Sequence, residues 1–296
     1  MATGSVKELP LIVVVGPTAS GKTSLSIDIA KKFNGEIISA DSRAIYKGMD
    51  IGTAKPSDEE RAGIPHWGFD LVEPSGRFTA ADFKRYALEK VSEIRARGHL
   101  PILVGGTGLY VDAVLFDYEF GSQPDKEQRR EFEGMTLDEL HQYCYKNNII
   151  LPENSKNKRY VIRAIEQKSI NTKRREAPID NTIVVGIATN RAILKTRIEA
   201  RAEHIFDDGV VEEATLLGKK YGWNHESMTG NIYPLVHSYL EGELTGDEMK
   251  ERFTTLDWRL AKRQLTWLRR NPFIWWGNLT EVKEHLYQAL ANEQKS

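Results

Sequence analysis

The chain has little of several features that mark particular classes of protein. Its single cysteine, Cys144, excludes an internal disulfide framework and is typical of a reducing, cytoplasmic setting. We find no signal peptide and no apolar run long enough to cross a bilayer, so we expect no membrane partner. The 7 histidines show no metal-ligand spacing, and nothing in the sequence resembles a zinc finger.

An excess of one sign of charge is also lacking overall, but the local distribution is uneven. The net charge of −1 gives no global indication of a polyanionic partner, so any nucleic-acid surface must be local. One basic segment spans 156–175, and a second spans 258–270, where Trp258 and Trp267 stand among the charges. Each segment alone fits a solvated helix face, whereas the two together fit a polyanion-binding face equally well. The tryptophans either stack on bases or pack into the core.

A phosphate-binding loop is the most informative motif that is present. The stretch GPTASGKT fits the pattern G-x-x-x-x-G-K-[ST] and consists of Gly16, Pro17, Thr18, Ala19, Ser20, Gly21, Lys22 and Thr23. An apolar run at 11–15 precedes it and helical spacing follows it, which is the context that the motif requires. Backbone amides and a helix N-terminus then face the phosphates, with Lys22 at the outer phosphate and Thr23 at a divalent metal or a phosphate oxygen. The motif predicts a di- or triphosphate ligand.

A second polar segment follows the predicted strand at 36–39. Asp41 stands at the carboxyl end of this strand, where ligands bind in open α/β sheets. It lies near the phosphate-binding loop if the two strands are neighbours. Its carboxylate either holds a metal or accepts a proton from a nucleophile, or it caps the following turn. The glycine-punctuated stretch 48–56 is typical of a loop that contacts substrate.

Two further segments carry groups that suit phosphate oxygens. The stretch PILVGGTGLY at 101–110 runs from an apolar strand into a glycine-rich turn. Its amides and Thr107 form either a second oxygen cradle or a plain turn. Arg197 and Arg201 fall on one helix face, and Arg191 would act from the first turn of that helix. Their guanidinium groups bind either phosphate oxygens or neighbouring glutamates.

The order of elements predicts an α/β fold: a P-loop NTPase-like parallel sheet flanked by helices, with a helical insertion domain and a helical C-terminal region. After the strand at 11–15, strands are expected at 36–39, 69–72, 102–104, 182–187 and 273–276. Helices are expected at 79–97, 107–116, 126–147, 157–168, 191–220 and 229–268. The catalytic core is assigned to 1–117, 181–225 and 270–296, a helical insertion to 118–180, and a helical region packed on the core to 226–269.

Five segments of the sequence belong together: GPTASGKT, DSRAIYKGMDIGTAKP, PILVGGTGLY, NKRYVIRAIE and AKRQLTWLRR. In this order, and over nearly the whole chain, they resemble the tRNA dimethylallyltransferase family. The resemblance implies that the insertion at 118–180 contacts tRNA and that the helical region at 226–269 binds it. The first two segments together are highly specific, because ordinary P-loop kinases lack the second. The resemblance implies transfer of a prenyl group from dimethylallyl diphosphate to N6 of the tRNA adenosine 3′ of the anticodon. It also implies Mg²⁺ as cofactor and a compact bacterial form, which we expect to be a cytoplasmic monomer.

The resemblance implies roles for individual residues. Asp41 would be the general base, and the loop Gly16–Thr23 would hold the diphosphate, with the metal at Thr23. The catalytic residues would be Asp41, Thr107, Lys22, Arg191 and Arg197. The residues in contact with tRNA would be Asp41, Ser42, Arg43, Tyr46, Asp50, Gly52, Thr53, Lys55, Arg159, Arg163, Lys262, Arg263 and Gln264.

The chain departs from the family pattern at three positions. Ile232 precedes Tyr233 where the family has glycine, Tyr160 takes a place often held by arginine, and Ile165 replaces the usual leucine. These positions lie in regions expected to meet tRNA, so we expect them to affect RNA affinity or selectivity and to leave the chemistry intact.

Three other functions stay open on the sequence. An adenylate isopentenyltransferase of cytokinin synthesis shares the P-loop and the aspartate but tends to lack an end like AKRQLTWLRR. A small-molecule kinase would use the P-loop for ATP and leaves the stretch MDIGTAKP unexplained. An RNA-binding module that has lost catalysis would have no need of Lys22, Thr23, Asp41 and Thr107.

Overall fold

The computed structural model describes residues 8–120, 126–167 and 174–293. The chain divides into two compact units, one of Met1–Val114 with Asp180–Ser296 and one of Leu115–Ile179. The first unit contains the sheet, and the second is helical. The division into a core, a tRNA-contacting insertion and a tRNA-binding C-terminal region stays a prediction.

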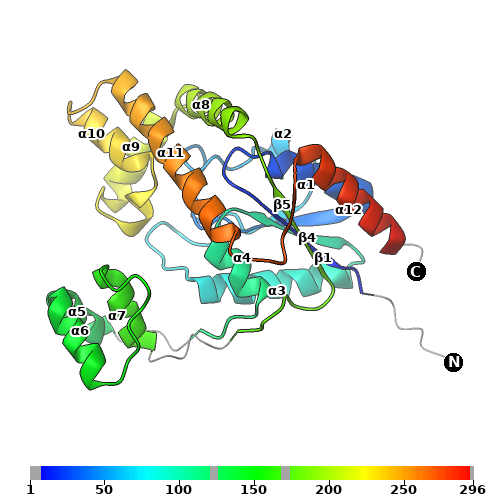
Figure 1. The fold of residues 1–296 in the computed structure, drawn as a ribbon. Helices are drawn as coiled ribbons and strands as arrows, with labels where there is room; N and C mark the ends of the chain where they lie inside the picture. Colours follow the sequence, from blue (N-terminus) through cyan, green and yellow to red (C-terminus); the bar gives the residue numbers. More distant parts are fainter. Residues whose placement is uncertain (1–7, 121–125, 168–173, 294–296) are drawn as a thin grey trace. The chain divides into compact units, whose positions relative to one another are not determined.

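A six-stranded sheet with the order β3-β2-β4-β1-β5-β6 forms the centre of the first unit (Figure 1). Every pairing between these strands is parallel, so the predicted α/β fold is confirmed. The strands are β1 (Leu11–Val15), β2 (Gly35–Ser39), β3 (His66–Trp67), β4 (Leu100–Gly105), β5 (Thr182–Ile187) and β6 (Trp275–Gly277). All five residues of β1 are buried, because helices cover both faces of the sheet.

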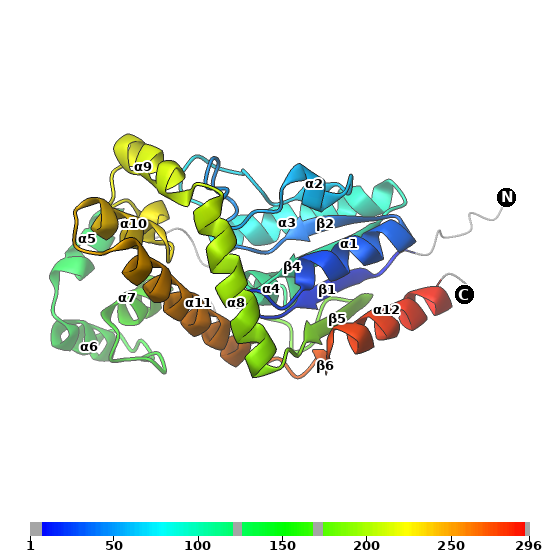
Figure 2. The ribbon, with the colours of Figure 1, turned by 90° about the horizontal axis from the view of Figure 1, so that it is seen from above.

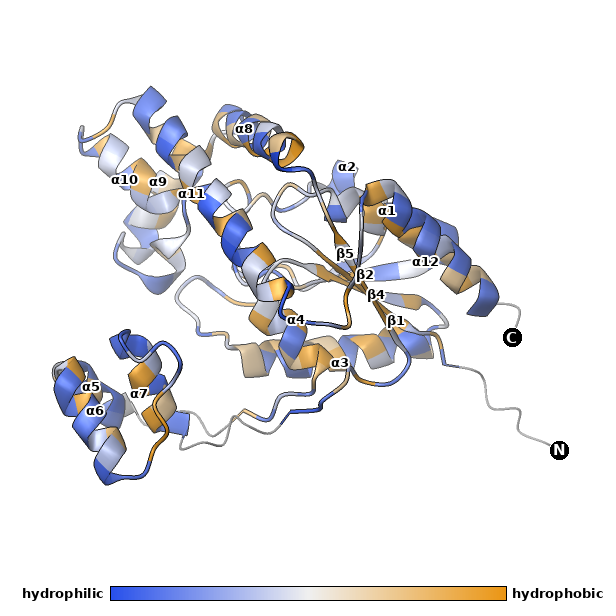
Figure 3. Cartoon of the chain, viewed as in Figure 1, coloured by the Kyte–Doolittle hydropathy of each residue, from blue (hydrophilic) through white to orange (hydrophobic). Residues whose placement is uncertain are grey.

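Helices pack on the two faces of this sheet (Figures 1 and 2). One face carries α1 (Lys22–Phe33) and α12 (Leu279–Glu293), where Ile12 and Val14 of β1 share an apolar cluster with Leu25 and Leu286. The other face carries α3 (Ala80–Ala96) and α4 (Gly108–Leu115). Figure 3 shows the same division, with apolar strands and with helices that are polar on their outer sides.

A group of helices lies beyond the carboxyl ends of the strands (Figure 2). It consists of α8 (Arg191–Asp207), α9 (Val210–Tyr221), the 3₁₀ helix η2 (Glu226–Thr229), α10 (Tyr233–Leu240) and α11 (Gly246–Leu268). The single helix expected at 191–220 is two helices, because Gly209 adopts a φ of 93° and separates α8 from α9. Leu194 and Ile198 of α8 pack against Ala261 of α11, which fixes the rotation of α8 about its axis.

One expectation about the sheet was wrong, and one condition is not met. The strand predicted at 69–72 is absent from the described structure: β3 ends at Trp67, and only Val72 forms an isolated bridge, with Tyr46. Asp70 has a φ of 54°, which is incompatible with an extended strand. In addition, β4 lies between β1 and β2, so the strand before Asp41 does not neighbour the strand before the phosphate-binding loop.

A buried carboxylate, that of Glu36, stabilises the sheet near the start of β2, at the amino ends of the strands. Glu36 accepts hydrogen bonds from Trp67 Nε1 at 2.6 Å, from Arg97 Nη2 at 2.8 Å and from His99 Nδ1 at 2.6 Å. Its side chain is 3% exposed. Burial raises the pKa of Glu36, but the hydrogen bonds outweigh that effect, so the pKa lies below its ordinary value.

The second unit is built from α5 (Lys126–Gly134), α6 (Leu137–Lys146) and α7 (Lys158–Gln167), which surround a small apolar core that includes Phe132 and Cys144. The helix expected at 126–147 is two helices, because Thr136 and Glu139 form a capping box that starts α6. A further helix, α2 (Asp58–Arg61), belongs to the first unit. Across the residues that the structure describes, no helix is both long and apolar enough to cross a membrane.

Candidate active-site cleft

A cleft of about 1470 Å³ opens at the carboxyl ends of the strands in the first unit. This is where open parallel sheets bind their ligands. Its lining comes from the phosphate-binding loop, the segment that follows β2, the turn that follows β4, and side chains of α8 and α11. Five of the segments singled out in the sequence thus contribute to one cavity.

The phosphate-binding loop is shaped for an anion. Gly21 adopts a φ of 94° immediately before α1, and the N-terminus of α1 supplies unpaired amides and partial positive charge. Lys22 Nζ donates to the carbonyl of Pro17 at 2.6 Å and remains at the cleft. Burial lowers the pKa of Lys22 to about 8, against the opposing effect of the Asp41 carboxylate and with that of Arg201. Lys22 is therefore a cation that its surroundings stabilise incompletely.

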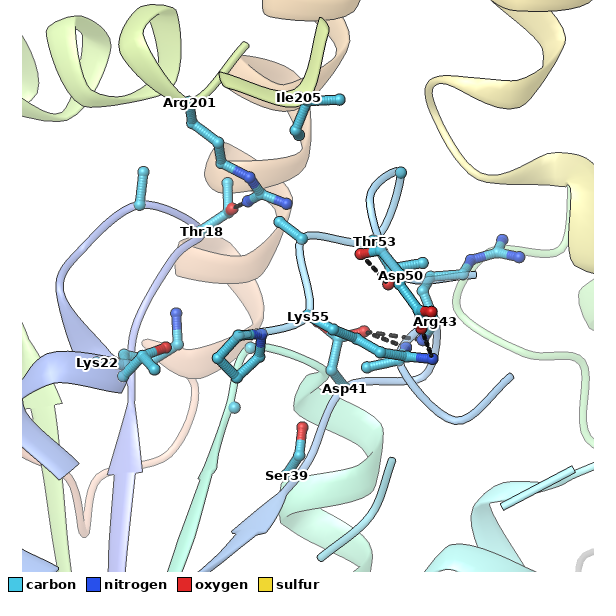
Figure 4. A pocket seen from close by; sticks show the side chains of 18 of the residues that line it. Thr18, Lys22, Ser39, Asp41, Arg43, Asp50, Thr53, Lys55, Arg201 and Ile205 are labelled. Atoms are coloured by element: carbon cyan, nitrogen blue, oxygen red, sulfur yellow. Dashed lines mark hydrogen bonds and ion pairs between the residues drawn. The ribbon is translucent and has the colours of Figure 1, made fainter. Parts of the chain in front are cut away.

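Two arginines of α8 reach this loop. Arg201 Nη1 donates to Thr18 Oγ1 (Figure 4). Arg197 Nη1 donates to the carbonyl of Ser20 at 3.2 Å. Both arginines line the cleft, as expected for residues on one helix face. Arg191 is not among the described residues that line the cleft, and its guanidinium lies 5.5 Å from the ring centroid of Trp258. The structure therefore places Arg197 and Arg201 together at the loop, whereas Arg191 lies away from it beside Trp258.

Asp41 lies in the same cleft and caps the turn that it begins. Its Oδ1 accepts hydrogen bonds from the amides of Arg43 at 2.8 Å and Ala44 at 3.4 Å. Within the described part of the chain, its Oδ2 has no hydrogen-bond partner. The two interpretations of this residue are therefore compatible, because one oxygen can cap the turn while the other accepts a proton.

The turn after β4 brings Thr107 against the segment that follows β2. Thr107 Oγ1 accepts from the amide of Ser42 at 3.1 Å and donates to Ser42 Oγ at 3.3 Å. A Cβ added at Gly105 would lie 2.2 Å from the carbonyl oxygen of Ala40, so only glycine allows this approach. Thr107 thus aligns the Asp41 segment, and its hydroxyl also lines the cleft.

Gln264 connects α11 to the phosphate-binding loop. Its Oε1 accepts a hydrogen bond from the amide of Thr18 at 2.8 Å. Arg263, the residue before it, lines the cleft as well. Lys262 is exposed, with its ammonium group 5.2 Å from the ring centroid of Trp258. The last turns of α11, which carry part of the second basic segment, therefore border the anion site.

The remaining residues predicted to contact tRNA divide into two groups. Asp50, Gly52, Thr53 and Lys55 line the cleft, as do Ser42 and Arg43. Tyr46 is 8% exposed and is not among the described residues that line the cleft, and its carbonyl accepts a hydrogen bond from Lys55 Nζ at 2.6 Å.

Lys55 is also paired with two carboxylates. Its ammonium group lies 2.7 Å from Asp50 Oδ1 and 2.7 Å from Asp70 Oδ1, and its side chain is 3% exposed. This cation holds its own loop together. A role in binding RNA stays a prediction.

In the second unit, Arg159 is exposed and Arg163 Nη1 lies 3.4 Å from Glu166 Oε2. Lys168 and Lys173 of the same basic segment lie outside the described residues. Of the departures from the family pattern, Tyr160 is 51% exposed, whereas Ile165 is buried in the apolar core.

Two acidic residues were missed in the sequence. Asp257 of α11 is buried, accepts from Asn231 Nδ2 at 2.9 Å and lies 3.8 Å from Arg201 Nη1. Glu213 of α9 accepts from three amides of the loop at 50–52. The only sequence signal for Asp257 is an acidic residue on the apolar face of a helix, and nothing local singles out Glu213.

The oxygen atoms that the cleft presents would bind Mg²⁺ only together with the oxygens of a bound phosphate. No group of three or more His, Cys, Asp or Glu that could hold a metal occurs among the residues described. Thr23 presents an exposed hydroxyl at the cleft, and Mg²⁺ commonly takes one or two protein oxygens together with phosphate oxygens and water. The residues present therefore suit Mg²⁺ that arrives with a diphosphate.

Comparison with known proteins points to one family. Residues 44–271 match the family model described as IPP transferase. The tRNA dimethylallyltransferase of Bacillus pumilus is 37% identical over 306 residues, which covers 96% of each chain. The tRNA dimethylallyltransferase of Acetivibrio thermocellus is 40% identical over 288 residues, which covers 92% of each chain.

Solved structures are similar to this chain over nearly its whole length. The tRNA isopentenylpyrophosphate transferase of Bacillus halodurans has a TM-score of 0.74 and 35% identity, covering 98% of this chain and 99% of its own. Its counterpart from Staphylococcus epidermidis has a TM-score of 0.72 and 34% identity, covering 96% and 99%. A eukaryotic dimethylallyltransferase acting on tRNA is 24% identical with a TM-score of 0.79 over 92% of this chain and 74% of its own, which shows a shared fold.

Proposed function

The chain belongs to the IPP transferase family, and from this premise we propose that its cleft transfers a dimethylallyl group from dimethylallyl diphosphate to N6 of adenosine 37 in tRNA. The family and the tRNA dimethylallyltransferase activity expected from the sequence are confirmed. The roles of individual residues are proposals, and they follow from the geometry of the cleft.

The donor diphosphate occupies the phosphate-binding loop. The amides at the start of α1 and the ammonium group of Lys22 face its oxygens. Arg197 and Arg201 reach the loop from α8 and are close enough to add guanidinium donors. Because the bond from C1 to oxygen breaks with its electron pair on the diphosphate, these cations stabilise the leaving group most strongly as the charge develops.

The acceptor amine lies toward Asp41. The N6 lone pair forms the new bond to C1 while the diphosphate leaves, and the N6 proton passes to Oδ2 of Asp41. Oδ1 keeps the turn in place meanwhile through the amide of Arg43. Thr107 holds the segment at Ser42, so that the carboxylate keeps its position during the transfer. Mg²⁺ bound with the diphosphate at Thr23 would add positive charge to the leaving group.

The observation that carries this proposal is the pairing of opposite charges in one cleft. The Asp41 carboxylate is close enough to Lys22 to affect its pKa, yet no hydrogen bond between the two appears among the described residues. A space flanked by a cation site on one side and a carboxylate on the other suits a reaction that expels an anion and releases a proton.

The remaining partners follow from the same assignment. We propose that the basic residues on α11 and in the second unit contact the tRNA backbone, which makes affinity dependent on salt. We further propose that the protein is cytoplasmic and monomeric. Light scattering of the purified protein checks the monomeric state directly. A mass of two chains would contradict it.

The direct test is transfer from labelled dimethylallyl diphosphate, with unmodified tRNA and AMP offered in parallel and products identified by nucleoside mass spectrometry. We expect label on adenosine 37 of tRNA and none on AMP. Label on AMP alone would assign the protein to adenylate prenylation and would leave its basic segments without a substrate.

A further inference from the structure

The loop at 49–55 forms part of the cleft wall and is folded into a tight turn. The amide of Ala54 donates to the carbonyl of Ile51 at 2.9 Å, and the amide of Lys55 donates to the carbonyl of Asp50 at 2.9 Å. Ala54 has a φ of 49°, in the left-handed region that alanine rarely adopts. Such a backbone persists only when its surroundings hold it in place.

Besides Lys55, which pairs with Asp50, the carboxylate of Glu213 near the start of α9 holds this turn. Its Oε2 accepts hydrogen bonds from the amides of Asp50 at 2.8 Å and Ile51 at 2.7 Å. Its Oε1 accepts from the amide of Gly52 at 2.9 Å and from Tyr233 Oη at 3.0 Å. Three consecutive amides thus surround one anion, in the arrangement by which backbone nests bind anions. These hydrogen bonds are charge-assisted and stronger than those between neutral groups.

Packing also supports the turn, and Met49 at its start is fully buried. A Cβ added at Gly52 would lie 2.7 Å from Tyr233 Oη and 2.9 Å from Ile232 Cγ2, so the turn fits closely against the start of α10. In contrast, a cavity of about 260 Å³ borders Gly48 and the side chain of Glu213. A Cβ at Gly48 would meet no atom within 4 Å. The Glu213 carboxylate therefore has open space beside it, and it joins the packed turn on one side to α9 on the other.

The turn and the anion site lie on different sides of the cleft. Figure 4 shows Asp50 and Thr53 well apart from Lys22, with Asp41 between them. Both Asp50 and Thr53 line the cleft, whereas Glu213 lies behind them and contributes only its carboxylate to their backbone. A change at Glu213 is therefore expected to reach the acceptor side of the cleft and to leave the donor side as it is.

We propose that Glu213 is a positioning residue for the transfer reaction: by fixing the turn at 50–53, it shapes the wall that receives the tRNA nucleotide. This inference rests on the proposed function, in which this wall contacts tRNA and the phosphate-binding loop contacts the donor. It assigns α9 a part in substrate recognition through a residue that touches neither substrate.

Steady-state kinetics of Glu213→Ala test the proposal. We expect the KM for tRNA to rise about 30-fold, which corresponds to about 2 kcal/mol at roughly 1.4 kcal/mol per factor of ten. This is the size expected when hydrogen bonds to a charged group are lost. The KM for dimethylallyl diphosphate should stay unchanged. A purely structural role would instead reduce the fraction of active enzyme, which lowers kcat and moves neither KM.

The neighbouring Glu212 provides a matched control. It is exposed on the same turn of α9, and Glu212→Gln should leave both KM values at the wild-type level. Glu213→Gln keeps the size of the side chain but has one acceptor oxygen, so its KM for tRNA should lie between wild type and Glu213→Ala. Tyr233→Phe removes one of the four hydrogen bonds and should have the smallest effect.

The outcomes separate this inference from the proposed function. If Glu213→Ala does not fold, Glu213→Gln decides, and an unchanged KM for tRNA in that variant overturns the positioning role. An equal rise in both KM values, or the same rise in Glu212→Gln, overturns it as well. If the wild-type protein transfers no prenyl group to tRNA, the proposed function fails, and the inference fails with it.

Discussion

Lys22 should make binding of the prenyl donor depend on pH in a range where an ordinary lysine would not. Burial lowers the pKa of this ammonium group from 10.5 to about 8 in the free protein. A bound diphosphate favours the charged form, so the pKa of Lys22 in the complex lies above that in the free protein. Affinity is therefore complete well below pH 8 and falls as the pH rises through about 8 toward the pKa of the complex.

The size of the effect follows from the fraction of charged Lys22. With a pKa of about 8, roughly nine tenths of the free protein carries the charge at pH 7 and roughly one tenth at pH 9. The dissociation constant for dimethylallyl diphosphate should thus rise about tenfold over this range, or about 1.4 kcal/mol. A lysine with the ordinary value of 10.5 would change affinity by only a few per cent.

Calorimetric titration with dimethylallyl diphosphate measures this affinity, because no turnover occurs without tRNA. Lys22→Arg is the matched variant, since its guanidinium stays charged across the range and should give a constant affinity. Lys22→Met should bind weakly at every pH. A wild-type affinity that is the same at pH 7 and pH 9, or an equal slope in Lys22→Arg, would refute the assignment of this pH dependence to Lys22.

Three other predictions concern the base, the fold and the RNA. Asp41→Asn keeps an oxygen to cap the turn but cannot accept a proton, so kcat should fall by about 10² to 10⁴ with tRNA binding retained; a fully active variant would leave Asp41 only the capping role. Glu36→Gln places an amide among donors and removes the carboxylate from the partly exposed Arg97, so denaturant unfolding should show a loss of about 1 to 3 kcal/mol with little change in activity per folded molecule; an unchanged midpoint would contradict this. Lys262→Ala and Arg263→Ala should each reduce the salt dependence of tRNA affinity by a slope of about 0.7 to 0.9, as measured by filter binding between 50 and roughly 200 mM salt. Identical slopes in wild type and variants would show that neither residue contacts phosphate.

The parts of the site that the sequence predicts well are those encoded over a short stretch of chain. The phosphate-binding loop needs only the strand before it and the helix after it, and all three are adjacent in sequence. The same holds for Asp41, because the end of a buried strand is visible as the end of an apolar run. The fold class follows likewise from the alternation of strands and helices.

The parts that could not be predicted depend on packing between distant segments. Helix arithmetic places Arg197 and Arg201 on one face, but the contact of α8 with α11 decides that this face meets the cleft and that Arg191 does not. The sequence around Lys55 is typical of a loop with an exposed cation. Its side chain is nevertheless buried, because it pairs with Asp70, 15 residues later in the chain. Glu213 lies more than 160 residues from the amides that it binds, so no local pattern marks it.

The place of β4 between β1 and β2 sets a length inside the molecule. Neighbouring strands are about 4.8 Å apart, so the strand ends that carry the cation site and the carboxylate are separated by two such steps, or roughly 10 Å. In the proposed reaction, that span would contain the diphosphate oxygens, the reacting carbon and the amine. A carboxylate on the strand directly beside β1 would have half this room. The order of the strands therefore sets the approximate distance between the cation site and the carboxylate, and the side chains change this distance only locally.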